Sequence, residues 1–266
     1  MGEDTIARFR AWIRRAFAGT ASSQDGSPKA GRTASRIGSA TRSGPLMQLY
    51  EDLCKAFAHE KALGYAINNA QDPESFARLD AAVSALVRAY IEAGHTDYRR
   101  YANFNPHHYV RNLIEENEDF ELMILCWQKG QGSRVHNHAD SHGWLTPLYG
   151  EMVEHQYEVT DAGSGEAPAD VPPLPGVLAA TSPCPTLRHL RTTRVGAGVV
   201  TYINDRLALH SVRCPDDCPT EPGGITLHIY SPPIRRVKLY EPESDRIVLR
   251  KPGFFTVRGR KLREKH

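Results

Sequence analysis

Two histidines separated by one residue, His136 and His138, offer the clearest chemistry in this chain, and His210 is a third candidate further along. If the first pair lies on a β-strand, both side chains point to the same face, because side chains alternate along a strand. Neutral imidazole is a good ligand for first-row metals such as iron, zinc, copper and nickel. An isolated pair of this kind is more often an ordinary polar stretch than a metal site, so the surrounding sequence has to decide.

The residues around the pair follow the spacing G-x5-H-x-H-x4-G-x6-G, from Gly130 to Gly150. This pattern resembles the first motif of the cupin β-barrel family, in which the position of Gly143 usually holds a metal-binding glutamate. The resemblance therefore implies a site of three histidines without a carboxylate. A divalent ion held by three neutral ligands keeps its charge and several open positions. It favours an anionic, chelating substrate such as a thiolate, with a position left for dioxygen.

Four blocks of sequence between about Leu49 and Phe255 resemble cysteine dioxygenase, the cupin-fold iron enzyme that converts cysteine to cysteine sulfinate. The blocks are Tyr109–Leu113, Leu122–Trp127 leading into His136–His138, Tyr202–Asp205 followed by His210, and Leu227–Pro233. The resemblance implies that His136, His138 and His210 bind Fe(II). It also implies that L-cysteine binds through its thiolate and amine, that both atoms of O2 pass to sulfur, and that the sulfinate leads toward taurine and sulfate.

The segment Thr226-Leu-His-Ile-Tyr230 alternates polar and apolar residues, as in a strand with one face on a core and one on a polar pocket. Thr226, His228 and Tyr230 then share the pocket face and can form a hydrogen-bond relay that holds the phenol near metal-bound ligands. Ser231-Pro-Pro233 ends the strand, because proline supplies no N–H to a sheet. The alternative is a half-buried core tyrosine; the resemblance favours the catalytic interpretation.

Arg111 is the predicted substrate anchor. Tyr109 and Arg111 share one face if their segment is extended, and a guanidinium binds a carboxylate through two parallel hydrogen bonds. In cysteine dioxygenases the matching arginine binds the cysteine carboxylate, whereas relatives that oxidise 3-mercaptopropionate carry glutamine there. Cysteamine has no carboxylate, so Arg111 argues against it. Two alternatives to cysteine oxidation remain. The protein is a dioxygenase for another small thiol such as 3-mercaptopropionate, or it is a non-catalytic cupin that binds a metal or small ligand as a sensor.

Several residues near the motif have other expected roles. Many animal and fungal relatives carry a cysteine at the position of Gly143 and join it to the tyrosine that matches Tyr230; glycine cannot form that thioether. Pro147 in the following strand predicts a bulge or a sheet edge. His142 is interpreted as a structural residue on a turn, and Trp127 and Met123 as residues of the pocket wall or the core.

Composition limits the classes of function. The 266 residues carry 33 Lys and Arg against 31 Asp and Glu, a net charge of +2, which gives no sign of nucleic-acid binding. We find no apolar run of the ~20 residues that cross a membrane. Five cysteines without a Cys-x2-Cys pair favour a reducing, cytoplasmic compartment. We interpret Cys214 and Cys218 as two loop thiols, with a metal or redox pair as the alternative.

The elements that must position these residues begin after an Arg/Ser-rich stretch, residues 1–45. We expect this stretch to be a disordered tail, with a mitochondrial targeting segment as the alternative. Residues 46–66 and 75–93 are predicted helices, the second capped by Asp72 and stopped at Gly94. Short strands from about residue 119 predict a β-barrel or jelly roll.

Together with the resemblance, this pattern predicts a mainly β, cupin-type double-stranded β-helix barrel with N-terminal helices packed against it. The predicted domain spans residues 46–257, with a mobile surface insertion near residues 161–185 and a basic, solvated tail at 258–266. Nothing in the sequence demands more than a monomer.

Overall fold

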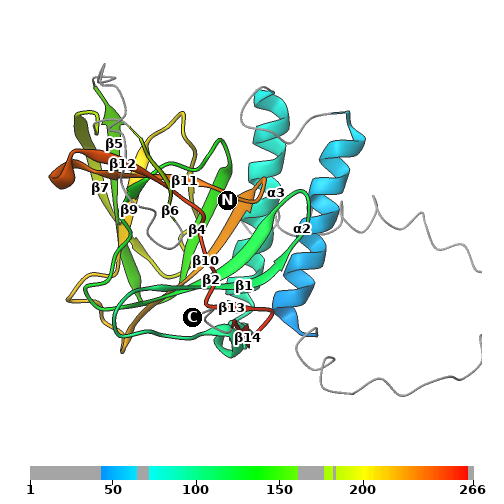
Figure 1. Cartoon of the computed structure of the whole chain (residues 1–266). Coiled ribbons are helices and arrows are strands. Elements are labelled where there is room, and N and C mark those ends of the chain that lie inside the picture. The colour runs from blue at the N-terminus through cyan, green and yellow to red at the C-terminus, as the bar shows by residue number, and fades with distance from the viewer. Residues whose placement is uncertain (1–42, 65–71, 161–176, 182–183, 263–266) are drawn as a thin grey trace, which may run out of the picture. The chain divides into compact units, whose positions relative to one another are not determined.

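The computed structural model describes residues 43–64, 72–160, 177–181 and 184–262, and the chain divides into Met1–Ser43 and Gly44–His266. The second unit begins with two helices and continues as two sheets of seven strands each (Figure 1). Its elements are α2 (Pro45–Ala62), α3 (Pro73–Glu92), η1 (Asp97–Tyr101), β1 (Val110–Glu116), β2 (Glu121–Gln128), β3 (Val135–His136), β4 (His142–Tyr149), β5 (Glu151–Val159), β6 (Val177–Thr181), β7 (Leu187–Gly196), β8 (Thr201–Ile203), β9 (Leu209–Arg213), β10 (Gly223–Ser231), β11 (Val237–Glu241), η2 (Pro242–Ser244), β12 (Arg246–Arg250), β13 (Thr256–Val257) and β14 (Arg260–Lys261).

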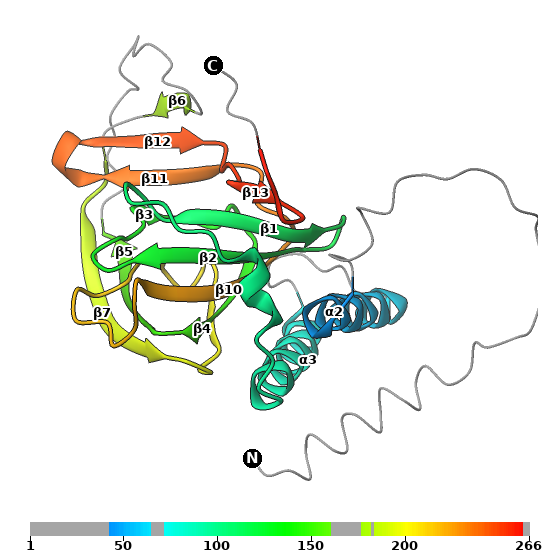
Figure 2. The same cartoon turned by 90° about the horizontal axis from the view of Figure 1, so that it is seen from below.

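The first sheet has the strand order β14-β13-β1-β2-β10-β4-β8, and the second has the order β6-β12-β11-β3-β9-β5-β7. Among the described strands the pairings are antiparallel, apart from the parallel pairing of β1 with β13. Figure 2 shows both sheets from below, with α2 and α3 beside the first sheet. The predicted fold class, a mainly β barrel of the double-stranded β-helix type with N-terminal helices, is confirmed.

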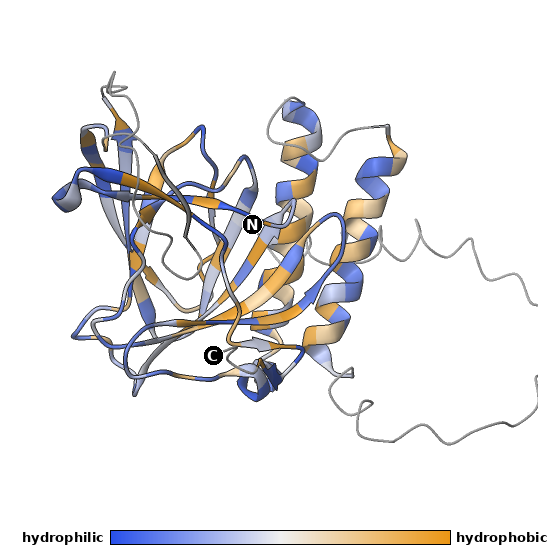
Figure 3. Ribbon diagram, viewed as in Figure 1, coloured by the Kyte–Doolittle hydropathy of each residue, from blue (hydrophilic) through white to orange (hydrophobic). Residues whose placement is uncertain are grey.

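The two faces of β2 belong to two different apolar clusters. Leu122 and Ile124 pack in a cluster that includes helix residues, whereas Met123 and Leu125 pack in a cluster inside the barrel. This division follows from the alternation of side chains along a strand. It also explains why β2 is apolar without interruption, since both of its faces are covered. Figure 3 shows apolar residues on the strands and on the helices beside them.

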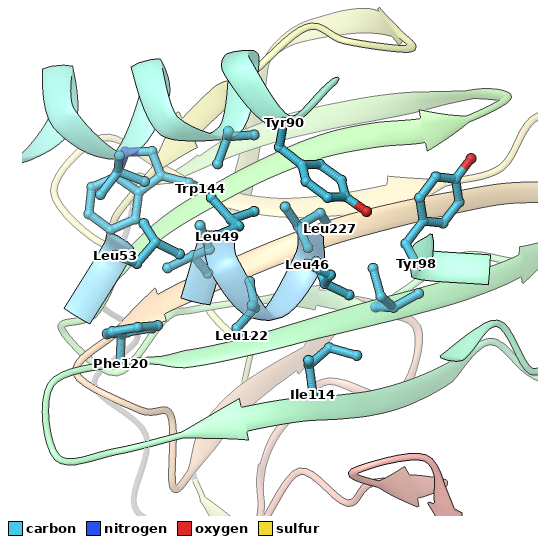
Figure 4. Close-up of a cluster of buried hydrophobic side chains, with 14 of the residues drawn as sticks. Leu46, Leu49, Leu53, Tyr90, Tyr98, Ile114, Phe120, Leu122, Trp144 and Leu227 are labelled. Carbon is cyan, nitrogen blue, oxygen red and sulfur yellow. The ribbon is translucent and has the colours of Figure 1, made fainter. Parts of the chain in front are cut away.

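The helices form the predicted packing layer over the first sheet (Figure 4). Leu49 and Leu53 of α2 lie in one buried cluster with Leu122 of β2 and Leu227 of β10. Burial of this apolar surface holds the helices on the outer face of the sheet.

The helix boundaries are close to those expected. Asp72 caps α3 by accepting hydrogen bonds from the backbone N–H groups of Glu74 and Ser75, each at 3.0 Å. The chain turns after α3 at Gly94, whose φ is 69°, a backbone conformation that favours glycine. Helix α2 ends at Ala62, four residues earlier than predicted.

Two segments that were expected to be a mobile insertion and a solvated tail contain strands, although residues 258–262 are exposed, as expected. Val177–Thr181 of the predicted insertion forms β6, which pairs with β12. Near the C-terminus, the Arg258 guanidinium donates to the Glu115 carboxylate at 2.6 and 2.7 Å, and β14 pairs with β13. An ion pair and a hairpin therefore hold this region against the sheet. Residues 161–176 and 182–183 of the insertion, the last four residues and the tail up to residue 42 lie outside the described residues, while Pro45 already begins α2.

Two smaller expectations concern β4. The register between β10 and β4 shifts where Ile225 pairs with Tyr149 and Thr226 with Pro147, so the predicted bulge at this proline is confirmed. His142 was expected on a turn, but it is the first residue of β4, where its ring stacks on Phe76. In the part of the chain that the structure describes, no helix has the length and apolar character to cross a membrane.

Candidate metal centre and its cavity

Three imidazoles from distant parts of the chain converge inside the barrel. His136 of β3 pairs directly with His210 of β9, and His138 follows two residues after His136. One ring nitrogen of each histidine lies within 4.8 Å of the other two, and the Nε2 atoms of His138 and His210 are 3.1 Å apart. Such a cluster of nitrogen donors fits a first-row divalent metal.

His136 and His138 were expected to reach the histidine cluster from one strand, but the structure differs. β3 ends at His136, so His138 is not on the same strand but at the start of a turn in which Ala139 and Asp140 have φ values of 51° and 63°. The carboxylate of Asp205 holds this turn, because it accepts hydrogen bonds from the backbone N–H groups of His138 and Asp140. The position of the His138 ring beside His136 and His210 therefore depends on this turn and not on the alternation of side chains along a strand.

Hydrogen bonds orient two of the three rings. The Nδ1–H of His136 donates to the carbonyl oxygen of Arg134 at 2.8 Å, and the Nδ1–H of His210 donates to Glu154 Oε1 at 2.7 Å. Each bond leaves Nε2 as the free donor atom, the arrangement by which neighbouring groups usually fix a metal-binding histidine.

The third ring has a looser partner. Nδ1 of His138 lies 3.4 Å from Asp205 Oδ1, which is close enough for an ion pair, but the geometry does not form a hydrogen bond. The ring is buried, so packing and the backbone turn determine its position.

Burial keeps two of the imidazoles uncharged. It lowers the pKa of His136 to about 3, with the neighbouring His138 adding to the effect, and it lowers the pKa of His210 well below the usual value. A neutral imidazole has a lone pair to offer, so neither of these two rings has to lose a proton before it binds a cation.

The cluster faces a cavity of about 980 Å³ whose lining includes Arg111 and Tyr109 as well as His136 and His210. The Arg111 guanidinium lies 4.9 Å above the ring of Phe254, and its Nη2 is 3.5 Å from Oε1 of the fully buried Glu121. Burial raises the pKa of Glu121, while the charge of Arg111 opposes that rise. The arginine is therefore paired with a buried acid on one side and lines the cavity on the other.

Tyr109 forms part of the cavity wall near the arginine. Its ring stacks on Trp127 with centroids 4.2 Å apart, and burial raises the pKa of its hydroxyl, against the nearby positive charge of Arg111. Tyr109 precedes β1, and it lines the same cavity as Arg111 two residues later, as expected for an extended segment.

The hydrogen bonds expected along β10 are present. Thr226 Oγ1 lies 2.8 Å from His228 Nε2, and His228 Nδ1 lies 3.0 Å from the Tyr230 hydroxyl oxygen. Trp127 extends this chain, because its Nε1–H donates to Thr226 Oγ1 at 2.9 Å. Burial, followed by the positive charge of Arg111, lowers the pKa of His228 to about 3, and burial raises the pKa of Tyr230. The histidine is thus neutral and the phenol protonated near neutral pH.

Gly143 lies against the ring of Tyr230. The two residues pair directly between β4 and β10, and a Cβ atom on Gly143 would come within 3.1 Å of Tyr230 Cε1 and of Ile203 Cγ2. The small residue therefore gives the tyrosine ring room, and hydrogen bonding and packing hold the ring in place.

The remaining candidates lie away from the histidine cluster or behind its wall. Met123 is buried in the interior cluster, and its Sδ lies 3.4 Å from Arg111 Nη2. His142 faces the helix side, where its Nδ1 is 2.6 Å from the Tyr202 hydroxyl. Cys214 and Cys218 lie in the loop after β9, as expected; both are buried, and the Cys218 Sγ lies 3.3 Å from the Thr220 hydroxyl oxygen.

Three acidic residues of the site were not singled out from the sequence: Glu154, Asp205 and Glu121. Glu121 could have been noticed in the sequence, because this acid begins an otherwise apolar strand whose faces are both covered. Asp205 stands at the end of one of the four blocks. Glu154 sits in a strand of alternating burial and gives no signal of its own, since its role depends on the register of β5 with β9.

Comparison with known proteins identifies relatives of this arrangement. Residues 73–243 match the family described as cysteine dioxygenase type I. Cysteine dioxygenase type 1 of Rattus norvegicus is 36% identical over 152 residues, which cover 57% of this chain and 64% of that protein. The Danio rerio enzyme of the same name is 32% identical over 160 residues, or 60% of this chain and 68% of the relative. The chain thus spans less than two thirds of the rat relative's length.

A solved structure of a conserved Klebsiella pneumoniae protein with a double-stranded β-helix domain is 14% identical and has a TM-score of 0.36. The match covers 55% of this chain and 96% of that one.

Proposed function

Because the chain belongs to the cysteine dioxygenase type I family, we propose that it is a non-haem iron dioxygenase that oxidises L-cysteine with O2 to L-cysteine sulfinate. The observation that carries the proposal is the meeting of three imidazoles beside a cavity that is also lined by the Arg111 guanidinium. His136, His138 and His210 would hold Fe(II). The bound ion would supply a Lewis acid for the thiolate and redox chemistry with O2.

The protein's own groups place the amino acid in the cavity. Arg111 binds the cysteine carboxylate through a charge-assisted pair, and Glu121 behind it keeps the guanidinium plane fixed. Tyr109 closes one side of this anchor by stacking on Trp127. Apolar side chains around the pocket, such as Leu125, limit water near the reacting sulfur.

Tyr230 supplies a hydroxyl donor to the bound substrate. Trp127 donates to Thr226, the threonine hydroxyl donates to Nε2 of His228, and Nδ1–H of His228 donates to the phenol oxygen. In this direction of the relay, the Tyr230 hydrogen stays free to point into the cavity. The raised pKa keeps that hydrogen on the oxygen across the physiological range.

The free thiols support a cytoplasmic location for the protein. All five cysteines, Cys54, Cys126, Cys184, Cys214 and Cys218, are unbonded, which supports a reducing and therefore cytoplasmic environment. A mitochondrial location would require a role for the residues before the domain, and that can be tested by following the intact chain in cells.

The direct test is oxygen consumption by iron-loaded protein with three thiols: cysteine, 3-mercaptopropionate and cysteamine. We expect cysteine to have the highest kcat/KM, because it alone combines a carboxylate for Arg111 with an amine for the metal. Equal rates for all three would remove the assigned role of Arg111. No oxygen uptake by folded, iron-loaded protein would favour a binding protein over an enzyme.

A further inference from the structure

The cavity carries more positive charge than the carboxylate of one cysteine requires. Its lining residues include five arginines and lysines and no aspartate or glutamate, although the whole chain has a net charge of only +2. The five are Arg111, Arg134, Arg250, Lys251 and Lys261. A volume of about 980 Å³ is also at the upper end of the range that binds drug-sized ligands. Both features point to a ligand with more than one anionic group.

Some of these cations already have partners in the protein. Arg111 lies 3.5 Å from Glu121, Arg134 forms an ion pair with Glu241, and Lys261 lies 4.7 Å from the centre of the Phe255 ring. Arg111 and Arg134 therefore face a carboxylate, and Lys261 an aromatic ring, before any ligand arrives.

Arg250 is different. Its Nε is buried, and it has no hydrogen-bond partner among the described residues. Leaving a charged donor buried without a partner is unfavourable, and such groups in folded proteins usually meet a water, an ion or a ligand. Because Arg250 lines the cavity, a ligand bound there can supply the missing acceptor.

The sheet register places Arg250 at a definite distance from the histidine cluster. His136 pairs with Leu239 on β11, and Val237, two residues before Leu239, pairs with Arg250 on β12. Directly paired side chains and those two residues apart share a face, so Arg250 and His136 both face the barrel interior. Their Cα atoms are separated by two inter-strand spacings across the sheet and by two residues along the strand. This corresponds to about 12 Å.

Because the two side chains project in the same direction, their tips lie about as far apart as their Cα atoms. Two residues of extended peptide span about 7 Å, and a metal–thiolate bond of about 2.3 Å together with a hydrogen bond of about 2.9 Å covers the rest. A ligand held at the metal by its thiol can therefore reach the guanidinium with a carboxylate one residue further along.

We infer that Arg250 forms a second carboxylate subsite, which takes the C-terminal carboxylate of a short peptide whose N-terminal residue is cysteine. Such a peptide keeps the free amine and thiol of cysteine for the metal, and its peptide carbonyl faces Arg111. A guanidinium suits the terminal carboxylate because it binds with two parallel hydrogen bonds. The inference rests on the proposed binding of a thiol at the three histidines.

The test compares two ligands that differ in one group, cysteinylglycine and its C-terminal amide. Binding to iron-loaded, full-length protein is measured calorimetrically without oxygen, so turnover is not required. We expect the acid to bind the wild-type protein about ten-fold more tightly than the amide, the effect of one charge-assisted hydrogen-bonded pair. Arg250→Gln should remove this preference, and Arg250→Lys should keep part of it.

Arg236→Gln is the matched control, because it removes one positive charge from an exposed residue that does not line the cavity. It should leave the preference for the acid over the amide unchanged. Equal affinities of acid and amide for wild-type protein would overturn the inference. An equal loss in Arg236→Gln would also overturn it, since overall charge would then explain the effect. Failure of cysteine oxidation with an intact acid preference would count against the proposed function alone.

Discussion

Replacing Arg111 by glutamine should have two separable effects, one on substrate binding and one on stability. The guanidinium faces the cavity on one side and lies 3.5 Å from the fully buried Glu121 on the other. Glutamine is shorter and uncharged, so it can replace neither the carboxylate anchor nor the partner of the buried acid.

The expected magnitudes follow from these two contacts. Loss of a buried charge-assisted pair with the substrate costs about 2–5 kcal/mol, so kcat/KM for cysteine should fall roughly 30-fold to several thousand-fold. Loss of one partner of a buried ion pair destabilises a protein by about 3–5 kcal/mol. The free energy of unfolding of Arg111→Gln should therefore fall by an amount in this range.

A double variant separates the two effects. Arg111→Gln combined with Glu121→Gln removes the unpaired buried charge, so most of the lost stability should return, measured by urea denaturation. The kcat/KM for cysteine, measured by sulfinate formation, should stay low because the substrate anchor is still missing. Recovery of kcat/KM in the double variant would refute the assignment of Arg111 as the anchor.

The stability loss of Arg111→Gln should also depend on pH. Burial raises the pKa of Glu121 in the folded protein. Between its usual value of about 4.3 and the raised folded value, the native state binds more protons than the unfolded state, so stability falls as pH rises. The deficit of Arg111→Gln relative to the double variant should be largest above the folded pKa and should shrink on acidification. A deficit that grows as pH falls would contradict the role of Glu121.

Three further variants test the rest of the site. Glu154→Gln weakens the hydrogen bond that orients His210, so iron affinity should fall roughly 10- to 100-fold in a chelator competition, and an unchanged affinity would count against this orientation. Tyr230→Phe should lower kcat while iron content stays the same; a loss of iron instead would mean that the tyrosine supports the metal site. Gly143→Ala places a methyl group 3.1 Å from the Tyr230 ring and from Ile203, so it should lower both kcat and thermal stability, and wild-type values for both would show that the ring is not closely packed there.

The sequence was informative wherever a residue's role depends on its neighbours in the chain. The alternation of Thr226, His228 and Tyr230 predicted their shared face, and their hydrogen bonds are present. Asp72 and Gly94 predicted the ends of α3, because caps are local features.

Roles that depend on strand register could not be predicted. Glu154 reaches His210 only because β5 pairs with β9, and Arg250 faces the cavity only because β12 follows β11 in the second sheet. The aim of His138 depends on a turn held by Asp205 from 67 residues away. The described part of the C-terminal segment is exposed, as its basic character predicted, but the ion pair between Arg258 and Glu115 joins residues distant in sequence and could not be predicted.

The most direct test of the account is the fate of oxygen-18 gas supplied to iron-loaded protein with cysteine. If three histidines hold iron beside an anchored cysteine, mass spectrometry should find both labelled atoms in cysteine sulfinate, and His210→Ala should form none. Recovery of cystine alone, or of sulfinate whose oxygen comes from water, would contradict the proposed chemistry.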